Sequence, residues 1–156
     1  MALASFNAAQ ADDALAVMLS CCTSSRFAAA MVAGRPYPSP DAAVTAVDTV
    51  FESLTWDDVV EAMDGHPRIG ARVSGPSAAE QSGVADDARA ALAAGNAAYE
   101  ERFGHVFLIC ATGLSGTQLL AALEQRLHND ETSERLVATR ELHQITALRV
   151  RKKLAE

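Results

Sequence analysis

Residues 86–104 read DDARAALAAGNAAYEERFG, and this stretch decides the fold class. Alanine, a strong helix former, recurs throughout it, and Gly104 is typical of the position just past a helix end. We therefore predict a long helix from about Asp86 to Arg102. Alanine fills 32 of the 156 positions, whereas aromatic residues make up only 5% of the chain. This composition argues against a β-sandwich or barrel and predicts an all-α protein.

Helix-start signals divide the rest of the chain into further helices. A serine or threonine precedes several apolar stripes, and Ser39 is followed by Pro40, which suits the first turn of a helix. The predicted helices cover residues 12–21, 25–33, 40–54, 55–64, 115–127 and 132–153. Their apolar positions include Leu15, Val17, Met18, Leu19, Cys22, Val44, Val47, Val50, Phe51, Leu54, Leu119, Leu120, Leu123, Leu127, Leu136, Leu142, Ile145, Leu148 and Val150. We expect one compact multi-helix domain over residues 1–156, because neither a repeat nor a long linker interrupts them.

Charge and hydropathy exclude several classes of protein. A net charge of −7 argues against a nucleic-acid binder, and the basic cluster at residues 149–153 suits the end of a helix. No apolar run approaches 18 residues, so we expect no membrane span. The N-terminal residues lack the basic and apolar regions of a signal peptide. These features together predict a cytoplasmic protein.

The cysteines and histidines do not form a pattern typical of a metal site. Cys21, Cys22 and Cys110 cannot build a disulfide framework, and we expect them to be reduced packing residues. The four histidines are scattered without a pair at ligand spacing, so we do not expect a metal site. A thiol hydrolase that uses Cys110 stays open as an alternative, although nothing near Cys110 in the sequence supports it.

Three irregular segments are the candidates for chemistry, because functional groups concentrate on loops that a rigid scaffold holds. In the first, Pro67 keeps His66 out of helical geometry, which suits a general acid or base. In the second, Ser77-Ala78-Ala79-Glu80-Gln81 opens a helical turn whose N–H groups could bind an anion, and Gln81 suits a urea or amide group. The alternatives are a surface or capping histidine and an ordinary capping box.

The third segment is Phe107-Leu108-Ile109-Cys110-Ala111, part of an apolar run too short for a helix. We predict that it is buried and extended. If its backbone is only partly paired, its N–H and C=O groups could hold a planar polar ligand. The alternative is an ordinary buried strand.

These segments belong to a longer series of motifs in one order along the chain. Together the motifs resemble the OHCU decarboxylase family, the 2-oxo-4-hydroxy-4-carboxy-5-ureidoimidazoline decarboxylases of urate breakdown. The matching pieces are Cys21-Cys22-x-Ser24-x-Arg26-Phe27-Ala28, Gly34-Arg35-Pro36-Tyr37, Gly65-His66-Pro67-Arg68-Ile69-Gly70, Glu80-Gln81-x-Gly83, Tyr99-x-x-Arg102-Phe103-Gly104, Phe107-Leu108-Ile109-Cys110-Ala111, Arg126-Leu127-x-Asn129-x-x-x-x-Glu134 and Glu141-Leu142-x-x-Ile145-x-x-Leu148-Arg149.

The resemblance implies an all-helical, cofactor-free decarboxylase, commonly a homodimer. Its substrate would be the ureidoimidazoline that follows 5-hydroxyisourate hydrolysis, and its product (S)-allantoin. The implied catalytic residues are His66 and Glu80. Pro67, the turn from Ser77 to Gln81 and the segment from Phe107 to Ala111 would line the substrate site.

One departure from the family pattern concerns Thr112. Many relatives have an arginine there, directly after the Phe-x-Ile-Cys-Ala run. Arg68 or Arg72 is a candidate to replace that contact. A catalytically silent helical module that binds a small molecule is the alternative function, and Thr112 is its sequence support.

Overall fold

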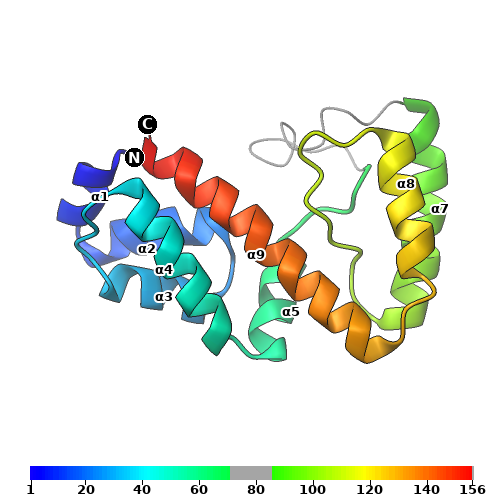
Figure 1. Cartoon of the computed structure of the whole chain (residues 1–156), viewed down its shortest axis with the longest axis horizontal. Helices are drawn as coiled ribbons and strands as arrows, with labels where there is room; N and C mark the ends of the chain where they lie inside the picture. The colour runs from blue at the N-terminus through cyan, green and yellow to red at the C-terminus, as the bar shows by residue number, and fades with distance from the viewer. Residues whose placement is uncertain (71–85, 156) are drawn as a thin grey trace. The chain divides into compact units, whose positions relative to one another are not determined.

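The computed structural model describes residues 1–70 and 86–155, and within them it has eight helices and no strand (Figure 1). The all-α prediction is therefore confirmed. The helices are α1 (Leu3–Ala8), α2 (Ala11–Cys21), α3 (Ser25–Ala33), α4 (Pro40–Ser53), α5 (Trp56–Asp64), α7 (Asp86–Phe103), α8 (Gly116–Arg126) and α9 (Glu131–Ala155).

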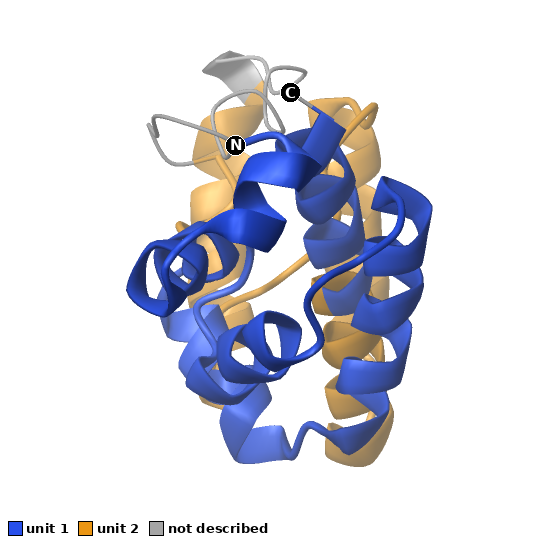
Figure 2. Cartoon of the chain, turned by 90° about the vertical axis from the view of Figure 1, so that its left-hand side faces the viewer, with its two compact units in different colours: residues 1–65, 143–156 blue, residues 66–142 orange. Residues whose placement is uncertain are grey.

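The described residues group into two compact units (Figure 2). The first unit holds residues 1–65 and the part of α9 that begins at His143. The second unit runs from His66 to Leu142 and contains α7, α8 and the first half of α9. Two of the three candidate segments, around His66 and around Ile109, belong to this second unit. The prediction of a single domain stays a prediction.

Side-chain caps start the helices where the sequence predicts them. Ser39 Oγ accepts a hydrogen bond from the Ala42 N–H at 3.1 Å at the start of α4. At the start of α8, Ser115 Oγ accepts from the Gln118 N–H, and Gln118 Oε1 accepts from the Ser115 N–H. These bonds satisfy N–H groups that have no partner within the helix, which explains the agreement.

In the first unit, α3 packs against α2 and α4, and phenylalanine and methionine side chains fill the core. Its fully buried side chains include Phe6, Met18, Phe27, Met31 and Met63. Helix α1 is absent from the predicted helices, the first of which begins at residue 12. Phe6 of that helix is nevertheless completely buried.

Several of the predicted apolar positions are not fully buried. In α4 the buried side chains are Ala43, Val47 and Phe51, whereas the other predicted positions, Val44, Val50 and Leu54, are only half-buried. Leu19 in α2 is 37% exposed, and Leu136 and Leu148 in α9 are 66% and 45% exposed. Helical periodicity identifies an apolar side chain, but neighbouring elements decide whether it is covered.

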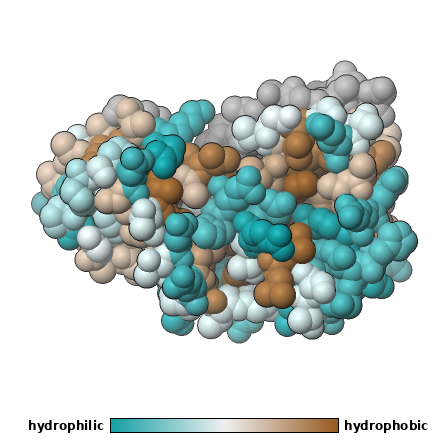
Figure 3. Space-filling model, in the orientation of Figure 1, coloured by the Kyte–Doolittle hydropathy of each residue, from teal (hydrophilic) through white to brown (hydrophobic). Residues whose placement is uncertain are grey.

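The surface is mostly polar on the face that Figure 3 shows, where apolar residues form separate groups between hydrophilic ones. Within the described part of the chain, no helix is long and apolar enough to cross a membrane.

The second unit is built on the contact between α7 and α8 (Figure 1). Leu92 and Tyr99 of α7 and Leu119 and Leu123 of α8 are fully buried in its core. Gly95 allows this close approach, because a Cβ atom at that position would lie 3.2 Å from Leu123 Cγ and still nearer to Leu123 Cδ2.

Gly95→Val is therefore expected to lower the free energy of unfolding by about 1–3 kcal/mol, since it overpacks a filled contact. Urea unfolding followed by circular dichroism measures this loss. Ala94→Val is the matched control, because Ala94 is exposed on the same helix. Equal stabilities of the two variants would contradict the packing role of Gly95.

Candidate functional site

The turn that carries His66 directly follows α5 and is not helical, as the sequence predicts. His66 and Pro67 are half-buried, and Ile69 is only 5% exposed. A half-buried imidazole keeps access to a ligand or to water while its surroundings limit its motion. This combination suits a group that transfers a proton.

Side chains of α7 hold this turn in place. Asn96 Nδ2 donates a hydrogen bond to the Ile69 carbonyl at 2.8 Å, and Arg89 Nη1 donates to the Gly70 carbonyl at 2.5 Å. Arg68 forms an ion pair with Glu100 at 2.9 Å. Three contacts to one helix therefore fix residues 68–70, which follow His66 and Pro67 directly.

Asn96 and Arg68, which make two of these contacts, are both candidates for a role in the site. Asn96 is 3% exposed, and its Oδ1 has no hydrogen-bond partner among the described residues. Arg68, a candidate to replace the arginine missing at Thr112, is engaged by Glu100 in this structure. Arg72, the other candidate, lies outside the described residues.

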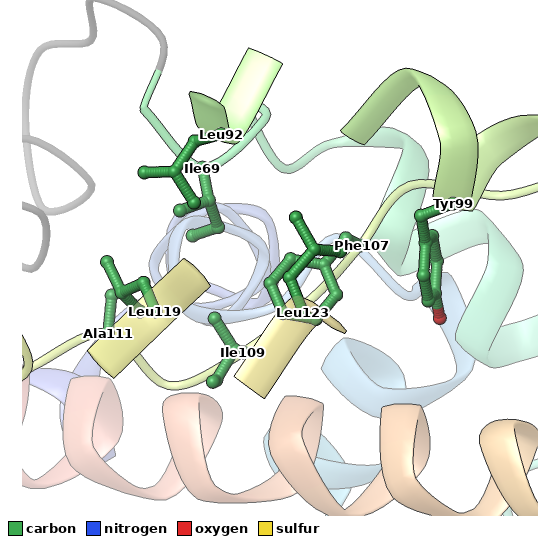
Figure 4. Close-up of a cluster of buried hydrophobic side chains, with 8 residues drawn as sticks. All are labelled: Ile69, Leu92, Tyr99, Phe107, Ile109, Ala111, Leu119 and Leu123. Carbon is green, nitrogen blue, oxygen red and sulfur yellow. The ribbon is translucent and has the colours of Figure 1, made fainter. Parts of the chain in front are cut away.

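The segment from Phe107 to Ala111 is buried at all five positions and is neither helix nor strand. The predicted burial is confirmed, and the segment is not the ordinary strand of the alternative interpretation. Phe107, Ile109 and Ala111 join the core cluster with Leu119 and Leu123 of α8 (Figure 4). This alternation is typical of extended backbone, in which every second side chain points to the same side.

The same core cluster includes Ile69 from the His66 turn (Figure 4). The structure therefore brings together two segments that are about forty residues apart in the chain. Packing of Ile69 with the alternate side chains of 107–111 couples the turn to the extended segment.

A buried charged cluster lies beside this segment. Glu134 is completely buried, and its Oε1 accepts hydrogen bonds from the Tyr99 hydroxyl and from Nε and Nη2 of Arg126, at 2.5–2.8 Å. Asn129 Nδ2 donates to the other carboxylate oxygen at 3.0 Å. The remaining Arg126 group, Nη1, donates to the Leu108 carbonyl at 2.6 Å.

Electrostatics and ring contacts tie the same groups together. The Arg126 guanidinium carbon lies 4.5 Å from the centre of the Phe107 ring and 5.9 Å from that of Tyr99. Burial, together with the hydrogen bond to Glu134, raises the pKa of the Tyr99 hydroxyl. Tyr99 therefore stays a neutral donor to the carboxylate throughout the physiological range.

The motifs of the family resemblance include Tyr99, Arg126, Asn129 and Glu134, but no role was predicted for these residues. A signal was available in the sequence. Arg126 and Glu134 flank the short connection between two helices, and the arginine guanidinium matches the geometry of a carboxylate. Their burial, however, depends on the Phe107 segment, which is distant in sequence.

Comparison with known proteins identifies the family. The model of the family described as OHCU decarboxylase matches residues 7–151. The chain belongs to the OHCU decarboxylase family. It is 35% identical over 144 residues to the uric acid degradation bifunctional protein TTL of Arabidopsis thaliana, a match that covers 85% of this chain and 44% of that protein.

Two further relatives agree with this assignment to the OHCU decarboxylase family. A 2-oxo-4-hydroxy-4-carboxy-5-ureidoimidazoline decarboxylase of Amia calva is 31% identical over 134 residues, which is 79% of this chain and 77% of that protein. A crystal structure of OHCU decarboxylase in the presence of (S)-allantoin matches with a TM-score of 0.79 and 32% identity, over 95% of this chain and all of that one. The resemblance is confirmed.

The second candidate segment of this OHCU decarboxylase family member, Ser77, Ala78, Ala79, Glu80 and Gln81, lies outside the described residues. Across residues 1–70 and 86–155, no three His, Cys, Asp or Glu side chains gather where they could hold a metal ion.

The three cysteines of this OHCU decarboxylase family member form no disulfide and are buried, as predicted. Burial raises the pKa of the Cys21 and Cys22 thiols, which lowers the fraction of reactive thiolate. Cys110 is 9% exposed and belongs to the Phe107 segment.

We expect iodoacetamide to modify the native protein far more slowly than the urea-unfolded chain, and to leave its activity intact. Mass spectrometry of time points, together with the activity of each sample, tests this. Rapid loss of activity that parallels modification of Cys110 would instead support the thiol hydrolase.

Proposed function

We propose that this protein decarboxylates 2-oxo-4-hydroxy-4-carboxy-5-ureidoimidazoline to (S)-allantoin in urate degradation, without a cofactor. The observation that carries the proposal is the shared core of the His66 turn and the Phe107 segment, in a chain that belongs to the OHCU decarboxylase family. A titratable group and a strip of backbone amides are thereby held on one small unit.

Decarboxylation of this substrate requires few catalytic groups. The bond between the carboxylate and its ring carbon breaks, CO2 leaves, and the electron pair moves into the adjoining C=N group of the ring. The nitrogen of the former C=N group takes up a proton. The 4-hydroxyl proton is then lost as the ring carbonyl forms, and the carbon that bears the ureido group gains a proton, so one proton is consumed overall. The enzyme must hold the carboxylate out of the ring plane and deliver that proton to a single face.

The predicted residues match these tasks. His66 forms a hydrogen bond to the 4-hydroxyl and carboxylate and donates or relays the proton, next to Pro67. Glu80 assists as the second catalytic residue, and with Gln81 it binds the N–H and C=O groups of the ureido substituent. Ser77, Ala78 and Ala79 offer backbone N–H groups, and the segment from Phe107 to Ala111 binds the ring amide.

We also propose that residues 1–156 act as one functional domain, that the protein is a cytoplasmic homodimer, and that the reaction uses neither a metal nor a cofactor. The support for one domain is that the family match at residues 7–151 includes both compact units. Sedimentation equilibrium tests the dimer, since it gives the mass of the assembly directly.

The function is tested with freshly generated substrate. The protein is expected to speed the decay of the substrate's ultraviolet absorbance and to yield one enantiomer of allantoin, measured by circular dichroism. Decay at the spontaneous rate, with a racemic product, would overturn the proposal.

The second candidate is a module that binds a small molecule without turnover. Thr112, which is exposed, favours it because many relatives have an arginine there. Calorimetry with (S)-allantoin distinguishes the two functions: binding by a protein that leaves the decay rate unchanged would support the silent module.

A further inference from the structure

Arg126 links a buried carboxylate to the backbone of the Phe107 segment. Its Nε and Nη2 atoms reach Glu134, and Nη1 reaches the Leu108 carbonyl on the other side. The guanidinium also lies over the neighbouring Phe107 ring. One rigid side chain therefore contacts both the ring and the backbone of two consecutive residues.

The fixed direction of the Leu108 carbonyl also sets the direction of the carbonyls on either side of it. Successive carbonyls of an extended chain point in opposite directions, so we expect those of Phe107 and Ile109 to face away from Arg126. Helices and strands orient backbone groups through their own hydrogen bonds, but this segment belongs to neither. In this segment the Arg126 guanidinium orients part of the backbone instead, through its hydrogen bond to the Leu108 carbonyl.

Arg126 itself is held tightly. The Glu134 carboxylate accepts from Tyr99 and Asn129 as well, so both of its oxygens are used. The Arg126 and Glu134 side chains are 8% and 0% exposed. Apolar residues of similar size often stabilise a core as well as a buried ion pair does, so stability alone does not account for this cluster.

We infer that Arg126 is a positioning residue for substrate binding, and that Glu134, Tyr99 and Asn129 hold its guanidinium for this task. Arg126 sets the direction of the backbone groups from Phe107 to Ala111. This inference rests on the proposed function, which assigns those groups to the ring amide of the substrate. It concerns binding of the substrate and leaves proton transfer at His66 unchanged.

The test compares Arg126→Lys with wild type at a temperature well below the unfolding midpoints. Lysine keeps the charge but cannot reach Glu134 and Leu108 together. We expect KM to rise about tenfold, the effect of one lost hydrogen bond, while kcat stays within about threefold. Tyr99→Phe keeps the hydrogen bond from Arg126 to the Leu108 carbonyl and should raise KM less than Arg126→Lys does. If Arg126→Lys does not fold, Tyr99→Phe replaces it as the test variant.

Two controls separate positioning from general destabilisation. Arg135→Lys alters an exposed ion pair with Glu131 on α9 and should leave KM unchanged. Met31→Ala destabilises the core of the first unit and should lower the unfolding midpoint without raising KM. If Met31→Ala raises KM as much as Arg126→Lys does, the inference is wrong.

Hydrogen exchange provides a readout that does not depend on activity. In Arg126→Lys the amides of residues 107–111 should exchange faster, while those of α3 keep their rates. Unchanged exchange together with unchanged KM would overturn the inference even if the enzyme is active. Faster exchange in a protein whose wild type has no activity would support the positioning of the segment and reject the proposed function.

Discussion

His66→Asn is expected to lower kcat by about 10²- to 10⁴-fold, the usual contribution of a general acid or base. Asparagine keeps a polar side chain of similar reach but cannot exchange a proton near neutral pH. Absorbance decay with freshly generated substrate measures the rate, and chiral analysis of the allantoin shows whether the residual product is racemic.

The control for this variant is His128→Asn. His128 is exposed just after α8, and its replacement should leave the rate unchanged. Both variants should keep the helical circular dichroism and the unfolding midpoint of the wild type. Full activity of His66→Asn would remove this histidine from the mechanism.

Glu134→Gln is expected to lower the free energy of unfolding by about 3–5 kcal/mol, because it leaves the Arg126 cation buried without a counter-charge. The glutamine amide would also face Asn129 Nδ2, a donor, where the carboxylate oxygen now accepts. Urea unfolding followed by circular dichroism measures the loss.

Glu131→Gln is the matched control, one turn earlier in α9. Glu131 pairs with Arg135, but both side chains are about half exposed or more, so the expected change is below about 1 kcal/mol. If the two glutamine variants unfold at the same urea concentration, Glu134 has no special role in stability.

Local interactions made much of the second unit predictable. The capping box of Ser115 and Gln118 joins residues three apart, so the sequence contains the whole interaction. The end of α7 before Gly104 is similar, since that glycine adopts a positive φ of 79°. The non-helical turn at His66 also follows from one neighbour, Pro67.

Other features could not be predicted because their partners are distant in sequence. Asn96 reaches Ile69 across 27 residues, and Tyr99 reaches Glu134 across 35. Leu136 has the apolar side chain and spacing of a core residue, yet it is 66% exposed. Neither these long-range hydrogen bonds nor the exposure of Leu136 can be predicted from the pattern of residue types along the chain.

The amino-acid sequence was thus sufficient to predict the helical class, most helix ends, the extended Phe107 segment and the family. Each of these depends on local propensity or on short motifs. Tertiary structure alone decided that the His66 turn shares a core with that segment, and that Arg126 joins Glu134 to the Leu108 carbonyl. The physical reason is burial: where the packed chain excludes water, a charge or an amide is strongly stabilised by a partner inside the protein, and residues distant in the sequence supply that partner.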